Sequence, residues 1–194
     1  GSTAGVTIVS VGFLNNLRDL LDTPKDDLSD LSGEQLVKRK VRQWVCMGGK
    51  FPRGQFDDGN GEYNVMYDTT GSIRAILDWP TPVVFSGFEI GARIQSGAPL
   101  KSLAGPNPVQ LAYRHYTGGN SRESWDLTAV LFAVRGTADL WTLSEPGLCL
   151  MRNRVPHGFN EWIPAPGRNQ RYLVERKAPA EVGRILDDLM LAPP

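Results

Sequence analysis

The sequence predicts an α/β fold in which a mostly parallel sheet is flanked by helices, with a small antiparallel hairpin near the C-terminal part. Expected strands and helices alternate along the chain, which is typical of parallel sheets with helical crossovers. The strands are continuously apolar, as strands covered on both faces are. Three strands end at glycine, and ligands of open parallel sheets bind at such ends: Gly12, Gly48-Gly49 and Gly87.

The first third of the chain predicts two strands joined by helices. Val6–Val11 is apolar and β-branched and is interpreted as a central strand covered on both faces. Four leucines then recur at helical spacing: Leu14, Leu17, Leu20 and Leu21. Ser32–Gln35 forms a capping box that opens a second helix, and Val41–Met47 is the next strand.

A loop, a helix and a third strand are expected next. Phe51–Gly61 is rich in glycine, proline and aspartate and is predicted to be a loop. Asp68–Trp79 is predicted to be a short amphipathic helix that ends before Pro80, and Pro82–Ser86 a short apolar strand.

Two helices are predicted at Asn107–Tyr116 and Trp125–Val134. The second carries apolar residues on several sides, so we expect it to be buried around most of its circumference. Leu140–Met151 and Gly158–Ile163 are expected to pair as strands. The last elements are expected to be a strand at Tyr172–Glu175 and a helix at Pro179–Leu191.

Composition narrows the function classes. The 194 residues contain 21 basic and 21 acidic side chains, so net charge favours neither a nucleic acid nor an anionic membrane as partner. No apolar run reaches the roughly 18 residues that a membrane span needs. Only two cysteines and two histidines are present, which excludes a multi-histidine metal centre and argues against structural zinc.

Three polar patterns are candidates for a site. Ser10–Asn16 joins a strand to a helix, and taken alone an ordinary turn is the simpler interpretation. Glu62 and Asn64 offer donors and acceptors for vicinal sugar hydroxyls, although a polar loop end is the simpler interpretation. Asp126 could cap its helix or bind a hard cation such as calcium.

Taken in order, these segments resemble the inosine–uridine-preferring nucleoside hydrolases. Val6–Asn16 is similar to that family's V-T-L-V-P-T-G-P-L-T-N segment, and Met47–Gly49 and Glu62–Asn64 to its M-G-G and E-F-N motifs. Asp68–Ser72 resembles the D-P-E-A-A helix start, and Trp125–Leu127 resembles H-D-P. The resemblance covers residues from about 6 to 190 and implies a Rossmann-like α/β fold.

The resemblance implies an enzyme that cleaves the N-glycosidic bond of nucleosides with a bound Ca²⁺. It implies that Asp126 and the main-chain carbonyl of Val11 bind the metal. It further implies that Glu62 and Asn64 hold ribose hydroxyls, with Met47 near the sugar. The ion would orient the attacking water and lower its pKa.

One departure concerns the start of the family's fold. The D-x-D-x-x-x-D-D pattern that supplies most calcium ligands and the general base is absent. We therefore interpret residues 1–194 as a single partial domain, the C-terminal portion of the fold. Its expected partners are the missing N-terminal half and a nucleoside or related ribosyl substrate. The intact protein is expected to form a homo-oligomer and to bind neither nucleic acid nor membrane.

The second departure is Trp125, which stands where many members have a histidine that protonates the leaving base. An indole N–H donates a hydrogen bond but does not transfer a proton near neutral pH. The ring could stack on a planar leaving group, and Arg122 or Tyr63 are weaker candidates to assist departure.

Two functions from different classes follow. The favoured one is a calcium-dependent N-ribohydrolase whose isolated C-terminal portion is inactive. The alternative is a catalytically silent module that binds ribose or nucleosides. A nucleotide-dependent oxidoreductase is disfavoured, because no G-x-G-x-x-G follows a strand.

Overall fold

The computed structural model describes residues 5–105, 107–153 and 157–192. A seven-stranded sheet runs in the order β1-β2-β3-β9-β7-β8, with β6 paired to β9. The first four strands of this order are parallel, and β6, β7 and β8 are antiparallel to their neighbours. The strands are β1 Val6–Ser10, β2 Val41–Met47, β3 Val83–Ser86, β6 Trp141–Leu143, β7 Gly147–Arg152, β8 Phe159–Pro164 and β9 Gln170–Glu175. The predicted fold class is confirmed.

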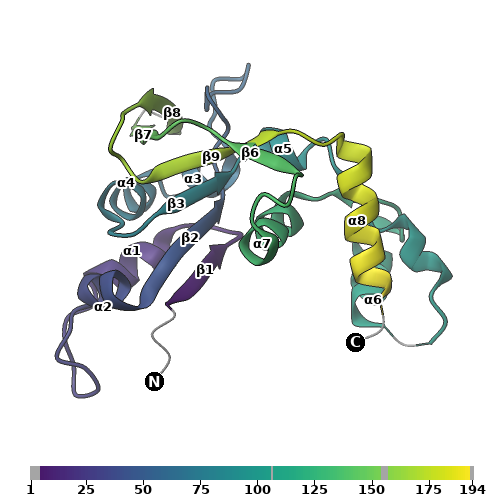
Figure 1. The fold of residues 1–194 in the computed structure, drawn as a ribbon, viewed down its shortest axis with the longest axis horizontal. Coiled ribbons are helices and arrows are strands. Elements are labelled where there is room, and N and C mark those ends of the chain that lie inside the picture. The colour runs from purple at the N-terminus through teal and green to yellow at the C-terminus, as the bar shows by residue number, and fades with distance from the viewer. Residues whose placement is uncertain (1–4, 106, 154–156, 193–194) are drawn as a thin grey trace.

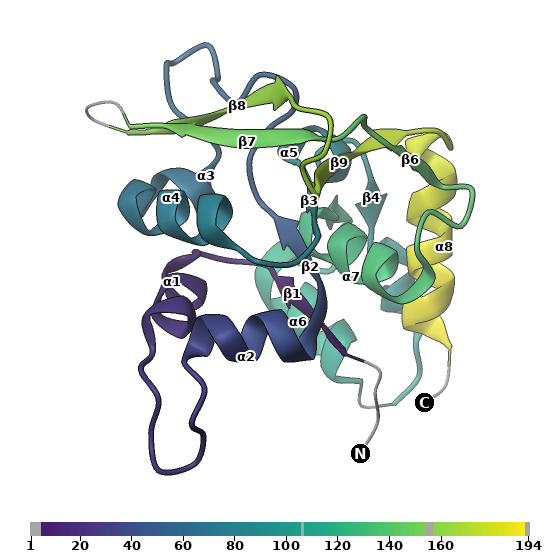
Figure 2. The same cartoon turned by 60° about the vertical axis from the view of Figure 1, so that its left-hand side comes forward.

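Helices cover both faces of the parallel strands (Figure 1). The helical elements are α1 Asn15–Asp22, α2 Gly33–Lys40, α3 Tyr63–Met66, α4 Thr69–Asp78, α5 Phe88–Gly91, η1 Ala98–Ser102, α6 Pro108–Thr117, α7 Trp125–Arg135 and α8 Pro179–Leu191. Two short strands, β4 Gln95–Ser96 and β5 Arg122–Glu123, form a separate antiparallel pair. Figure 2 shows α1, α2 and α4 on one side of the sheet and α7 and α8 on the other.

Strand β2 shows why the sheet has two apolar layers. Trp44 and Cys46 belong to the core cluster beneath α1, α2 and α4, whereas Val45 and Met47 belong to the cluster beneath α7 and α8. Successive side chains of a strand point to opposite faces, so a continuously apolar strand needs cover on both sides. The predicted strand at residues 41–47 is confirmed, with Arg42 exposed near its start.

Strand β1 lies at an edge of the sheet in this chain. Within the described residues it pairs only with β2 and is partly exposed: Val6 retains 57% of its accessible surface, and Val11, the residue after the strand, 44%. That Val6–Val11 is a central strand of the complete fold stays a prediction, because the segment expected to cover this edge lies outside the chain.

Helix α7 also differs from expectation. Ala129, Leu131 and Phe132 are buried against the sheet, but Val130 and Val134 are 46% and 77% exposed. The helix packs one face on β1, β2 and β3, and the described residues leave the opposite apolar face uncovered. Burial around most of the circumference is therefore wrong for this chain.

The C-terminal hairpin is confirmed in modified form. β7 and β8 pair antiparallel along their whole length, but the segment before β7 is a separate strand, β6, that pairs with β9. The capping box of α2 is present, with Ser32 accepting from the Gln35 amide. No helix in the described part of the chain is long and apolar enough to cross a membrane.

Candidate functional site

A cavity of about 760 Å³ opens at the carboxyl ends of the parallel strands. Val11 follows β1, Met47 ends β2, and Phe88 begins α5 just after β3; all three line this cavity. Parallel strands place their carboxyl ends at one edge of a sheet, where open α/β folds bind their ligands. The structure brings together every residue predicted for the site: Val11, Met47, Glu62, Asn64, Trp125 and Asp126.

Glu62 is held by the main chain. Its Oε2 accepts from the Gly49 amide at 2.9 Å and its Oε1 from the Asn64 amide at 3.1 Å, so it caps α3 and ties that helix to the end of β2. The residue is only 4% exposed. Burial raises the pKa of the Glu62 carboxyl, and the nearby charge of Asp126 adds to the rise, while the amide hydrogen bonds oppose it.

The amide of Asn64 is anchored to Met47. Its Nδ2 lies 3.2 Å from the Met47 carbonyl oxygen and 3.0 Å from the Met47 sulfur. This contact fixes the amide plane at the cavity wall. The side-chain nitrogen is thus committed to the protein, and Asn64 Oδ1 is the atom of this group available to accept from a sugar hydroxyl.

The first turn of α7 has a fixed position at the cavity wall because hydrogen bonds join it to neighbouring elements. The Ser124 amide donates to the carbonyl oxygens of Ile94 and Gly91, at 2.9 and 3.2 Å. Ser86 Oγ at the end of β3 lies 2.9 Å from Thr128 Oγ1, one turn into the helix. These bonds place Trp125 and Asp126 opposite the strand ends.

Trp125 is part of an aromatic wall. Its indole Nε1 donates to the Phe88 carbonyl oxygen at 3.0 Å, and the two rings lie 5.3 Å apart. The indole N–H is therefore used within the protein. The ring face remains a wall of the cavity, which fits the stacking role expected for this position rather than hydrogen-bond donation to a ligand.

Arg122 lies between two aromatic rings. Its guanidinium carbon is 4.8 Å from the centre of the Tyr116 ring and 5.5 Å from that of Trp125. Both distances fall within the range of favourable cation–π contacts. Among the described residues lining the cavity, Arg122 is the single basic side chain.

Asp126 lies in the first turn of α7 but does not cap it, because Ser124 occupies the N-cap position. Desolvation raises the pKa of the Asp126 carboxyl and the charge of Arg122 lowers it, with desolvation the larger effect. The carboxylate faces the cavity, where a ligand or a cation has access to it.

The described residues do not fit a calcium ion on their own. Calcium takes six to eight oxygen ligands. Here the candidates are the Asp126 carboxylate and the Val11 carbonyl, because both carboxylate oxygens of Glu62 already accept main-chain hydrogen bonds. The described part of the chain holds no group of three or more histidine, cysteine, aspartate or glutamate side chains suited to a metal.

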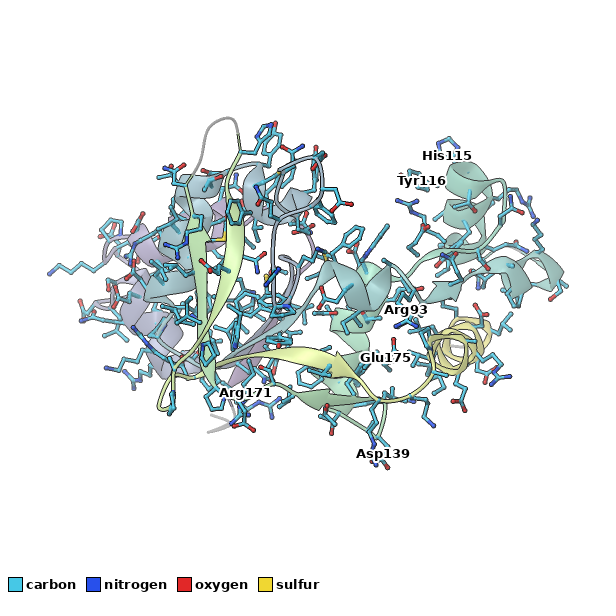
Figure 3. All side chains as sticks on the ribbon, turned by 90° about the horizontal axis from the view of Figure 1, so that it is seen from above. Arg93, His115, Tyr116, Asp139, Arg171 and Glu175 are labelled. Atoms are coloured by element: carbon cyan, nitrogen blue, oxygen red, sulfur yellow. The ribbon has the colours of Figure 1, made fainter. Side chains whose placement is uncertain are left out.

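Sequence reasoning missed the contribution of α6. Ala112, Tyr113, Tyr116 and Thr117 line the cavity from this helix, which lies about 50 residues along the chain from Glu62. Nothing in the local pattern of α6 marks it as a site, since its aromatic residues read equally well as packing residues. Figure 3 shows His115 and Tyr116 at the same end of this helix. Neither His115 nor His157, both exposed, lines the cavity.

No protein-family model matches the sequence, and no curated protein matches it either. Solved structures do. A plant nucleoside hydrolase aligns with a TM-score of 0.67 and 16% identity, over 96% of this chain and 62% of that one. The inosine–uridine-preferring nucleoside hydrolase of Bacillus anthracis gives 0.65 and 16%, over 97% and 61%.

A third structure, the type III effector protein XopQ complexed with adenosine diphosphate ribose, aligns with a TM-score of 0.54 and 14% identity. The alignment covers 97% of this chain and 59% of the effector. These similarities show that the chain has the nucleoside-hydrolase fold, as the motif resemblance implied. The chain spans about three-fifths of the length of the structures that it matches.

Proposed function

We propose that this chain contributes the greater part of the site of an N-ribohydrolase, an enzyme that cleaves the N-glycosidic bond of nucleosides or related ribosyl compounds. The observation that carries the proposal is the convergence of the six predicted residues on one cavity at the strand ends of a nucleoside-hydrolase fold. Ligands of the solved relatives are consistent with this class, since the effector structure contains a ribosyl compound.

In this proposal, residues on one side of the cavity contact the ribose of the ligand and residues on the other side contact its base. Asn64 accepts a ribose hydroxyl through Oδ1 while Met47 holds the amide in place. Glu62 fixes the position of Asn64 by capping α3 and contributes a buried negative charge beside the sugar. Trp125 supplies a planar surface for the departing base.

The proposed reaction is attack of water at C1′ through an oxocarbenium-like transition state. The positive charge that develops on the ribose ring is favoured by the acidic side of the cavity, where Glu62 and Asp126 lie within electrostatic range of each other. Holding the ribose by its hydroxyls orients C1′ toward the water and supplies part of the rate enhancement.

The proposed enzyme would bind Ca²⁺ only with additional ligands that this chain does not supply. Asp126 and the Val11 carbonyl are its expected contributions, and too few oxygens are described here to hold the ion. We propose that the remaining ligands and the general base come from the N-terminal half of the fold. The open edge of β1 and the exposed apolar face of α7 are surfaces that such a half would cover.

Uridine binding to the 194-residue chain tests the ribose side directly. We expect calorimetry to detect weak binding that Asn64→Ala lowers about tenfold, because the sugar loses its fixed acceptor. Asn169→Ala is the matched control, since Asn169 is exposed and does not line the cavity. Binding that is absent, or equally strong in the Asn64 variant, contradicts the proposal.

Hydrolysis by the protein completed with its N-terminal half separates the enzyme from a silent binding module. In that protein Asp126→Ala should abolish turnover, and Asn64→Ala should cost about 2–4 kcal/mol of transition-state stabilisation. The silent module is favoured by one observation, that the described residues hold no metal-binding cluster. A completed protein that binds nucleosides without hydrolysing them would establish that alternative.

A further inference from the structure

We propose that Arg122 is the residue that stabilises the leaving base. It does so by pairing with the negative charge of the base rather than by giving the base a proton. The inference rests on the proposed N-ribohydrolase function and adds the residue and the chemical class of leaving group. It begins from the position of Arg122 in the aromatic part of the cavity, three residues before Trp125 on the short strand β5.

On the leaving-base side of the cavity, the lining phenols are those of Tyr113, whose hydroxyl lies 3.4 Å from Ser96 Oγ, and Tyr116, which is 70% exposed. No histidine, cysteine or lysine is among the described residues that line the cavity, and the indole N–H of Trp125 is already donated to Phe88. Tyr63, which also lines the cavity, is packed among Phe13 and Tyr67 and is 57% exposed. A guanidinium is therefore the best-placed donor of hydrogen bonds to a base.

Two aromatic faces hold the guanidinium in place. Tyr116 comes from α6 and Trp125 from α7, so rings of two separate helices contact the guanidinium of Arg122. The N–H groups of the planar guanidinium match a base that carries exocyclic carbonyl oxygens, such as an oxopyrimidine or oxopurine.

Arg122 is available to a ligand. Its nearest acidic partner is Glu123, at 3.4 Å, and the two side chains are 41% and 36% exposed. An ion pair this long and this exposed is weak and yields readily to a better acceptor. The other acidic residues that line the cavity, Asp58, Glu62 and Asp126, leave Arg122 as the one described place where negative charge is favoured.

The chemistry is balanced without an acid. Water attacks C1′, the C1′–N bond breaks, and its electron pair stays on the base nitrogen. The water loses one proton to a general base, and the released base is an anion paired with Arg122 until it takes a proton from solvent. A guanidinium remains protonated throughout, because its pKa lies far above neutrality. The proposed substrates are thus nucleosides of oxopyrimidines or oxopurines, whose released bases are stable as anions.

The test uses 5-fluorouracil, an oxopyrimidine whose ring N–H ionises at mildly alkaline pH, as a probe of the leaving anion. Calorimetry on the 194-residue chain compares binding below and above that ionisation. We expect the anion to bind about tenfold or more tightly than the neutral base, and Arg122→Gln to remove this preference. Arg93→Gln is the control, because Arg93 pairs with Glu175 and does not line the cavity (Figure 3).

Arg122→Lys keeps the charge but loses the planar fork, so a smaller preference for the anion is expected. The inference is overturned if wild-type protein binds both forms equally or neither form. It is also overturned if Arg122→Gln keeps the preference, or if Arg122→Lys, with its fold intact, shows none. Uridine binding distinguishes the two proposals: uridine bound through Asn64 without anion preference leaves the N-ribohydrolase proposal standing and removes this one.

Discussion

The indole of Trp125 donates its N–H to the main-chain carbonyl of Phe88 at 3.0 Å, which joins the first turn of α7 to the start of α5. Phe88 follows the end of β3, so this bond spans two walls of the cavity. Trp125, for which the family resemblance implies a place on the leaving-group side, therefore has a structural role.

Replacing Trp125 with phenylalanine should lower the free energy of unfolding by about 1–3 kcal/mol. The change removes the indole hydrogen bond to the Phe88 carbonyl, which keeps the one from the Ala92 amide, and it removes part of a ring that packs on Phe88. Urea unfolding measures it. Tyr116→Phe is the control, because Tyr116 is 70% exposed and loses only a hydroxyl. Equal stability of the Trp125 variant and wild type would show that the bond is unimportant.

Gly91→Ala should be strongly destabilising, by more than about 2 kcal/mol. A methyl group at Gly91 would collide with the main chain of Trp125, because α5 packs directly against the first turn of α7 there. Gly12→Ala is the matched control, because a methyl group at Gly12 meets nothing within 4 Å and its φ is not positive. Similar melting temperatures for the two variants would contradict the close approach of these helices.

Glu89 should make stability depend on pH. Burial raises the pKa of its carboxyl from 4.5 to about 7 in the folded protein, against the hydrogen bond donated by the Phe51 amide. Between those two values the folded state holds a proton that the unfolded state has lost. Stability should therefore fall as pH rises from about 4.5 to about 7 and change little from this group above that.

Glu89→Gln should remove that part of the pH dependence and stabilise the protein above neutrality, by on the order of 2 kcal/mol. Glu145→Gln, on the turn before β7, serves as the exposed control. Denaturation at a series of pH values compares the slopes. A Glu89 variant with the wild-type slope would show that this carboxyl is not the titrating group.

Calcium should bind the 194-residue chain only weakly. Asp126 and one carbonyl leave most of the six to eight coordination positions to water. Calorimetry with Ca²⁺ is the measurement, and Asp126→Asn should abolish whatever weak heat is seen. Micromolar affinity in the wild-type chain would show that it already holds a complete site.

The uncovered apolar surface of α7 should promote self-association of the isolated chain. Val134 is 77% exposed and lies beside Val130, on the face turned away from the sheet. Val134→Lys should shift sedimentation toward the monomer at no cost in stability. Leu28→Lys, at a 95% exposed position in the loop before α2, should leave association unchanged. A wild-type chain that is monomeric at high concentration would contradict this expectation.

Several elements were predictable because local chemistry specifies them. The capping box at Ser32 begins α2 where expected, and α8 has the predicted bounds, since Pro179 starts it and its apolar residues repeat at helical spacing. Five short motifs in order supplied the six candidate site residues, and all six line the same cavity.

Other features were not predictable from local patterns. Val6 belongs to an edge strand and Val134 to an exposed helix face, although both sit in apolar sequences that read as buried. Burial depends on which other segments arrive at a surface. An apolar sequence indicates that burial is favourable, but it does not show whether another segment packs on it.

The sequence by itself determined the parallel α/β class and the strand ends at which the cavity lies, because hydrophobic periodicity and glycine positions are local properties. Only the tertiary structure decided that Tyr116 of α6 and Trp125 of α7 would contact Arg122. It also decided that both carboxylate oxygens of Glu62 would accept hydrogen bonds from main-chain amides. Those contacts join segments far apart in the chain, and packing geometry alone sets the distances at which a side chain is free to meet a ligand.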